Sequence, residues 1–172
     1  MQNNLTKKEI DNLYNWTKKY DIKELKTKDK NKLLDIKELT LGELFRAEKK
    51  FSYIPNEIFK LVNLKELYIN SINLKALPKD IGNLINLKSL HIKSANLKEL
   101  PKEIKNLVNL ERIDIIRDGY AKELPNEILN FEKLKFIEIK KSGFIYKSFG
   151  REYKIEKAKK KIKKNINKTK KG

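Results

Sequence analysis

The chain has 172 residues, of which 39% are hydrophobic, and a formal net charge of +18. This length suits one domain or one short repeat array. No run of about 18 apolar residues is present to form a membrane-spanning helix, and the absence of cysteine excludes disulfides and thiolate sites. The first residues, MQNNLTKKEIDN, lack the apolar core of a secretory signal peptide. We therefore expect a cytoplasmic protein, although secretion by a route without such a peptide stays open.

Residues 6–20 predict a helix with a defined start. Thr6 and Glu9 fit a capping box, and Leu5 and Ile10 have the spacing of a hydrophobic staple. One helical face then carries Ile10, Leu13, Tyr14, Thr17 and Tyr20, with Trp16 at its edge. This aromatic helix could dock a partner. We favour a cap, because the end of a repeat array otherwise exposes apolar surface and an unpaired strand edge.

Residues 21–32 are charged and show no period, which predicts a connecting loop. The N-terminal part, a capping helix and loop, is therefore assigned to residues 1–32. The repeats follow in residues 33–143, with about five strands, and residues 144–172 form a C-terminal cap and lysine-rich tail.

A 23-residue pattern occurs twice between positions 61 and 106. Its apolar residues recur at the fixed period, so that Leu64, Leu67, Ile69, Leu74, Leu77, Pro78, Ile81 and Leu84 become Leu87, Leu90, Ile92, Leu97, Leu100, Pro101, Ile104 and Leu107. A disguised copy starts at Leu33, a fourth runs from Leu107 to Phe131, and a fifth strand ends near Ile139. Such a period predicts a solenoid.

Two copies depart from this length. The first holds a five-residue insertion within residues 42–53, which could carry specificity or could be drift near a terminal repeat. The fourth holds one extra residue around positions 118–120, where Asp and Gly suit a turn.

Within each copy, the spacing L-x-x-L-x-L puts its last two apolar residues on the same side of a short strand. Stacked copies place these strands side by side as a parallel sheet. The following L-P-x-x-I-x-x-L predicts a short helical return, with Pro78 in a first turn that tolerates a residue without a backbone donor.

These spacings resemble the leucine-rich repeat family, in particular its 23-residue L-P-x-x-I type common in intracellular and bacterial proteins. The resemblance covers residues 33–139. It implies an α/β solenoid with a concave parallel β-sheet that binds a protein partner. The family usually has Asn three residues after the last strand leucine, whereas the two central copies have Ile72 and Ala95 there, with Asn73 and Asn96 one residue later.

In register, three columns of outward side chains would form what we call the concave face. From these columns we predict a partner-binding surface of Glu66, Tyr68, Asn70, Ser89, His91, Lys93, Arg112, Asp114, Ile116, Phe136, Glu138 and Lys140. With Glu38, the columns hold four acids and three bases, a net of −1. Aromatic and Arg anchors among polar groups suit a protein interface better than a phosphate-binding groove.

Ser89, His91 and Asp114 would share this face, which raises the question of a catalytic triad. Ser89 and His91 lie two residues apart on one strand, roughly 6.6 Å by strand rise, and an open sheet offers no enclosed pocket. We predict a His91–Asp114 pair instead. No enzyme, cofactor, metal site or small-molecule substrate is expected.

The tail opens with aromatic residues and continues as EKAKKKIKKNINKTKKG, with apolar residues at helical spacing. Residues 144–172 hold 12 Lys or Arg against two Glu, a net of +10. This favours, as an alternative function, contact with a polyanion such as nucleic acid or an acidic membrane. The alternative for the tail itself is a solvated extension. The main hypothesis remains a protein-interaction module.

Overall fold

The computed structural model describes residues 5–42, 51–117 and 131–141. The strands, the return segments of three copies and the N-terminal helix fall within these ranges. Most of the insertion at 42–53, the extra residue around positions 118–120 and the tail at 144–172 lie outside the described residues.

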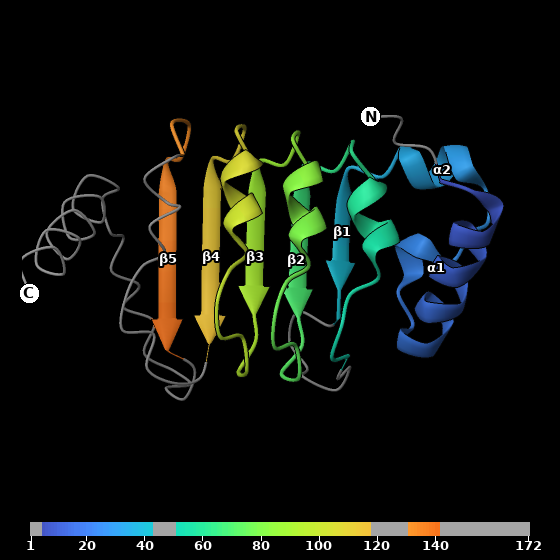
Figure 1. The fold of residues 1–172 in the computed structure, drawn as a ribbon, viewed down its shortest axis with the longest axis horizontal. Coiled ribbons are helices and arrows are strands. Elements are labelled where there is room, and N and C mark those ends of the chain that lie inside the picture. The colour runs from blue at the N-terminus through green and yellow to red at the C-terminus, as the bar shows by residue number, and fades with distance from the viewer. Residues whose placement is uncertain (1–4, 43–50, 118–130, 142–172) are drawn as a thin grey trace, which may run out of the picture.

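Five strands form one parallel sheet in chain order, and they are the core of the fold (Figure 1). They are β1 (Glu38–Leu41), β2 (Glu66–Asn70), β3 (Ser89–Lys93), β4 (Arg112–Arg117) and β5 (Phe136–Lys141). The register pairs each residue with its counterpart one copy away, beginning with Glu38, Glu66, Ser89, Arg112 and Phe136. The predicted α/β solenoid with a parallel sheet is therefore confirmed, together with its column alignment.

The return segments are single 3₁₀ helices that cover one face of the sheet (Figure 1). They are η2 (Asn56–Lys60), η3 (Lys79–Asn83) and η4 (Lys102–Asn106). Leu84 follows Ile81 by three positions. Side chains three positions apart lie on the same side of a 3₁₀ helix, so both point into the core. Pro78 lies at the N-cap in extended backbone, one residue before the helix, and not in its first turn as predicted.

The repeated leucines and isoleucines are buried between sheet and 3₁₀ helices. Leu64, Leu67, Ile81, Leu87 and Leu90 are all 0% exposed. Each coil closes its apolar side chains against the next coil, which is why one copy could not be stable alone.

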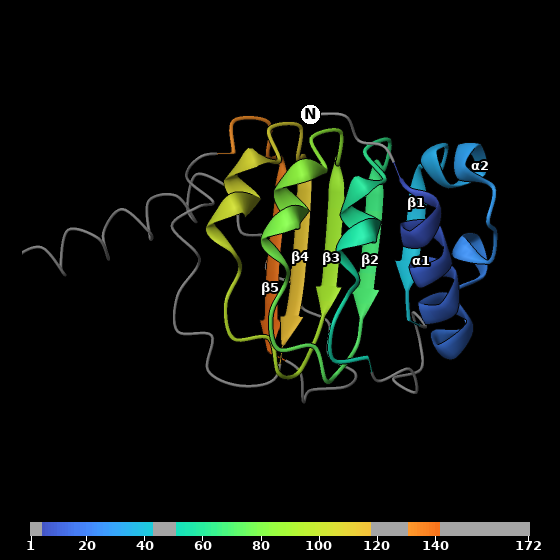
Figure 2. The ribbon, with the colours of Figure 1, turned by 45° about the vertical axis from the view of Figure 1, so that its right-hand side comes forward.

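The first helix, α1 (Lys7–Tyr20), stands beyond β1 at one end of the sheet (Figures 1 and 2). Its predicted capping box is present, because the Glu9 amide donates to Thr6 Oγ1 and the Thr6 amide donates to Glu9 Oε2. Trp16 was expected at the edge of the buried face, but it is 5% exposed and packs its ring against Tyr20 and Phe51. An indole is large enough to reach the core from that edge.

The loop prediction for residues 21–32 is wrong in part. This stretch contains η1 (Lys23–Leu25) and the start of α2 (Lys30–Leu34). The carboxylate of Asp29 caps α2 by accepting hydrogen bonds from the amides of Asn31 and Lys32. Helices this short show no readable period, and only the Asp at the N-cap could have indicated one.

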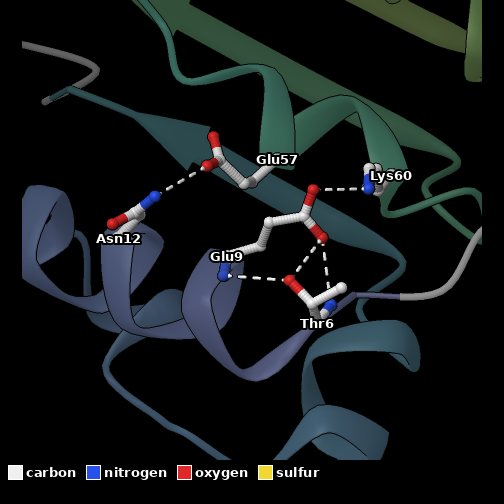
Figure 3. Close-up of polar contacts among 5 residues, drawn as sticks. All are labelled: Thr6, Glu9, Asn12, Glu57 and Lys60. Carbon is white, nitrogen blue, oxygen red and sulfur yellow. Dashed lines mark hydrogen bonds and ion pairs between the residues drawn. The ribbon is translucent and has the colours of Figure 1, made fainter.

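Polar contacts join α1 to the first return segment across the end of the solenoid (Figure 3). Glu9 Oε1 lies 2.6 Å from Lys60 Nζ, and Asn12 Nδ2 donates to Glu57 Oε1 at 3.4 Å. Lys60 and Glu57 both belong to η2. The helix is therefore fixed to the repeats by directional contacts as well as by packing.

An asparagine ladder connects neighbouring coils at the turns that enter the strands. Asn63 donates to the Leu34 carbonyl, Asn86 to the Val62 carbonyl and Asn109 to the Ile85 carbonyl, at 2.8, 3.0 and 2.8 Å. These three asparagines recur at the 23-residue period. The position where the family usually has asparagine lies instead at the turns that leave the strands.

Serine and one asparagine bond the backbone at the turns that leave the strands. Ser71 Oγ donates to the Phe51 carbonyl at 2.5 Å, and Ser94 Oγ donates to the Leu74 carbonyl at 2.7 Å. Both serines are buried. Asn96, one residue later than the family position, donates to the Ile72 carbonyl of the preceding coil at 2.6 Å. These serine hydroxyls, and the amide of Asn96 one position later, thus bond the backbone in place of the missing family asparagine.

Candidate functional site

The centre of the concave face is a contact between rings on neighbouring strands. The register sets Tyr68 of β2 beside His91 of β3, and His91 beside Asp114 of β4. The rings of Tyr68 and His91 are parallel, with an interplanar angle of 1° and centroids 4.3 Å apart. Stacked rings across adjacent strands are a stabilising cross-strand pair.

Asp114 collects two donors on a single oxygen. His91 Nδ1 lies 2.6 Å from Asp114 Oδ2, and Arg112 Nε donates to the same oxygen at 2.9 Å. On β2, Tyr68 Oη donates to Glu66 Oε2 at 3.2 Å. Five side chains on three strands therefore form one arrangement, which we call the concave network: Glu66, Tyr68, His91, Arg112 and Asp114.

Burial and charge compete at Asp114. The residue is 8% exposed, and burial alone would raise the pKa of its carboxyl group. The hydrogen bonds from His91 and Arg112, with the positive charge of Arg112, outweigh burial and hold this pKa below its usual value. Asp114 is accordingly an anion at neutral pH, held in place by its donors.

Tyr68 has the opposite shift. Burial raises the pKa of its hydroxyl group, and the nearby Glu66 and Glu38 carboxylates raise it further, while Arg112 acts against them. The hydroxyl therefore stays protonated and remains a hydrogen-bond donor to Glu66.

A shallow hollow of about 170 Å³ opens beside the network. Its lining comes from three adjacent strands and consists of Tyr68, Ile69, Asn70, His91, Ile92, Lys93, Asp114 and Ile116. Clefts that hold small-molecule ligands are usually about 300–1,000 Å³. The size of this hollow instead suits one inserted side chain.

The residues predicted for the surface differ in how much they expose. Lys93 is exposed, and Tyr68, Ser89 and Ile116 are half-buried. Asn70 was expected to offer a contact, but it is only 5% exposed, and Gly42 of the neighbouring coil lies against it. Phe136, Glu138 and Lys140 continue the three columns on β5 by register alone.

The structure does not assemble the serine, histidine and aspartate into a triad. Among the described residues, no hydrogen bond joins Ser89 to His91, whose Nδ1 faces Asp114 as predicted. No group of three His, Cys, Asp or Glu side chains in the described ranges could hold a metal ion. The ring stack was not predicted, although the shared column of Tyr68 and His91 was a signal for it.

Comparisons with known proteins point to repeats of the kind expected from the sequence. A family model described as a leucine-rich repeat region matches residues 79–156. This part of the chain carries leucine-rich repeats. A solved structure of a leucine-rich repeat protein from Leptospira interrogans is similar, with 35% sequence identity, a TM-score of 0.46, and 61% of this chain covered. The match spans 24% of that protein.

The search of curated proteins found no match to this chain. Within the part of the chain that the structure describes, no helix is long and apolar enough to cross a membrane.

Proposed function

We propose that this leucine-rich repeat protein is a binding module that holds a protein partner on its concave face. The observation that carries the proposal is the concave network, in which five polar and aromatic side chains are already ordered by one another. Ordering such side chains on binding costs about 0.5–1.5 kcal/mol each. A surface ordered in advance avoids most of that cost.

The chemistry of the network favours a protein over other ligands. Tyr68 and Arg112 belong to the residue types that dominate binding energy in protein interfaces, and the adjacent hollow suits one anchoring side chain. The columns are close to charge neutrality in a protein of +18. We propose no catalytic role, because His91 and Asp114, the side chains best suited to acid–base chemistry, are bonded to each other within the network.

A capture experiment with matched variants tests this proposal. The intact protein and a Tyr68→Ala/Arg112→Glu variant are used as baits, and bound proteins are compared by quantitative mass spectrometry. Lys102→Glu is the control, since it makes the same charge reversal on η4, on the other side of the coil. A partner retained by the control and lost by the double variant supports the proposal. Equal capture by all three baits contradicts it.

A second candidate function is polyanion binding through the tail. The observation in its favour is the net charge of +10 in residues 144–172, which exceeds half of the charge of the whole chain. Contact with about six phosphates predicts a steep loss of affinity with salt. Removal of residues from about Lys157 onward should abolish this binding and leave the concave partner bound, and binding insensitive to salt would refute it.

A further inference from the structure

An aliphatic row runs along one edge of the solenoid. Val62, Ile85 and Val108 occupy the same position in three consecutive copies, in the turns that join the 3₁₀ helices to the strands. These turns form the upper edge in Figure 1. Ile85 is 51% exposed and Val108 is 60% exposed, while Val62 is half-buried. Single exposed aliphatic residues are ordinary, but aligned ones form a patch.

The asparagine ladder fixes this row. Asn86 donates to the carbonyl of Val62, and Asn109 donates to the carbonyl of Ile85. Each asparagine directly follows the aliphatic residue of its own coil. It bonds the backbone carbonyl of the aliphatic residue in the preceding coil. The row therefore projects from turns that cannot fold their aliphatic side chains inward.

Lysine is in excess over acidic residues along the same edge. The five segments that enter the strands, at 35–37, 61–65, 84–88, 107–111 and 131–135, hold five Lys and three acidic residues, a net of +2. Lys65 and Lys88 are exposed three residues after Val62 and Ile85. Glu111 occupies the same position after Val108, where it pairs with Lys88 and Lys135. The concave face, in contrast, has a net charge of −1 by the column count.

We propose that this edge docks on an acidic membrane surface, with Val62, Ile85 and Val108 entering the boundary between headgroups and acyl chains. Aliphatic tips with lysine around them are the composition of interfacial membrane contacts, and each lysine near an anionic leaflet contributes about 1 kcal/mol. Lysine stems extend alongside apolar tips while their ammonium groups reach the lipid phosphates.

Two other occupants fit these observations less well. A second copy would bring another +18 charge to a basic edge, and the two would repel. Nucleic acid would pair with the lysines but would leave the aliphatic row facing a phosphate backbone. The membrane contact is independent of the proposed protein binding, because the strand ends and not the concave face would meet the lipid.

Site-specific fluorescence on the full chain tests this proposal. The protein contains no cysteine, so Ile85→Cys and Val108→Cys each give a unique position for an environment-sensitive nitrobenzoxadiazole label. Ala76→Cys is the control, since this exposed residue lies on the return path after β2, at the opposite edge. Labelled proteins are titrated with vesicles of phosphatidylglycerol and phosphatidylcholine at 3:7, with pure phosphatidylcholine vesicles, and with polyuridylate.

The expected result is a blue shift at positions 85 and 108 with the anionic vesicles, and none at position 76. An Ile85→Asn/Val108→Asn variant should bind the same vesicles at least tenfold more weakly, with an unchanged thermal melt because both side chains are exposed. Vesicle binding without a blue shift at 85 and 108 would mean contact through other residues and would overturn the proposal. An equal shift with polyuridylate, or unchanged affinity in the double variant, would also overturn it.

Discussion

Lys60 Nζ lies 2.6 Å from Oε1 of Glu9, although 51 residues separate the two in the chain. The other carboxylate oxygen of Glu9 accepts the Thr6 amide in the capping box. One side chain therefore both starts α1 and attaches it to the first return segment (Figure 3). The stability of the helix and its docking are coupled through Glu9.

The first prediction concerns this carboxylate. The Lys60 hydrogen bond, with the Thr6 amide, lowers the pKa of Glu9 below its usual value of 4.5. A lowered pKa in the folded state means stabilisation that is present above about pH 4.5 and is lost as the pH falls through the folded-state pKa. Glu9→Ala should lower the free energy of unfolding by about 1 kcal/mol at pH 7. Urea denaturation measures it.

Glu9→Gln serves as the matched control, because glutamine can close a capping box but carries no charge. Its loss at pH 7 should be smaller than that of the alanine variant. An equal loss in both would assign the whole effect to the ion pair, and no loss in either would show that the contacts contribute nothing.

The asparagine ladder gives the second prediction. Asn86→Ala removes the hydrogen bond to the Val62 carbonyl and should lower the free energy of unfolding by about 0.5–1.5 kcal/mol. The control is Asn83→Ala, since Asn83 is exposed and none of the described hydrogen bonds uses its side chain. Thermal or chemical denaturation distinguishes them, and equally stable variants would mean that the ladder does not contribute.

The third prediction tests the concave network. Asp114→Asn removes the charge that Arg112 and His91 share, and should cost roughly 1.5–3 kcal/mol at pH 7. Because the pKa of Asp114 is lowered in the fold, the stabilisation is present above its unfolded-state pKa and fades as the pH falls through the folded value. The wild-type and variant proteins should therefore converge in stability in acid.

Ser89→Ala is the comparison for Asp114→Asn on the same face. No hydrogen bond to the Ser89 side chain occurs among the described residues, so this variant should keep wild-type stability at every pH. A gap between wild type and Asp114→Asn that stays constant with pH would contradict the electrostatic explanation.

Gly42 supplies the fourth prediction. Its φ is +93°, and a Cβ there would overlap the backbone carbonyl of Asn70 on the neighbouring coil. Gly42→Ala should cost about 2 kcal/mol or more, since both the backbone conformation and the contact oppose a side chain. Gly42→Asn tolerates positive φ better but carries the same Cβ, so it should give little rescue. Full rescue by asparagine would leave backbone strain as the only cause.

The sequence was most informative where burial repeats. The 23-residue period fixed the strands, their order and their register, because leucine and isoleucine must point inward at every coil. That register also determined which outward residues share a column, so the His91–Asp114 pair could be predicted. That His91 and Arg112 share one oxygen of Asp114 could not be predicted, because it depends on how the three side chains are oriented in space.

Local chemistry without a long period was harder to predict. The short helix α2 depends on a single capping residue, Asp29, and Trp16 reaches the core through the size of its ring. The ladder asparagines recur at the repeat period, at Asn63, Asn86 and Asn109. The carbonyl groups that they bond could not be predicted, because these depend on how neighbouring coils pack. The burial of Asn70 likewise depends on the approach of Gly42 from the neighbouring coil.

The placement of the ladder has a consequence for how such a chain can change length. The segments that enter the strands all have the same length. Six positions lead from Leu61 to Leu67, Leu84 to Leu90, Leu107 to Ile113 and Phe131 to Ile137. The exits vary, with 14 residues from Leu41 to Pro55 and nine from Ile69 to Pro78. The edge held by asparagine sets the pitch of the coil, and the opposite edge is where new loops can be grafted without disturbing it.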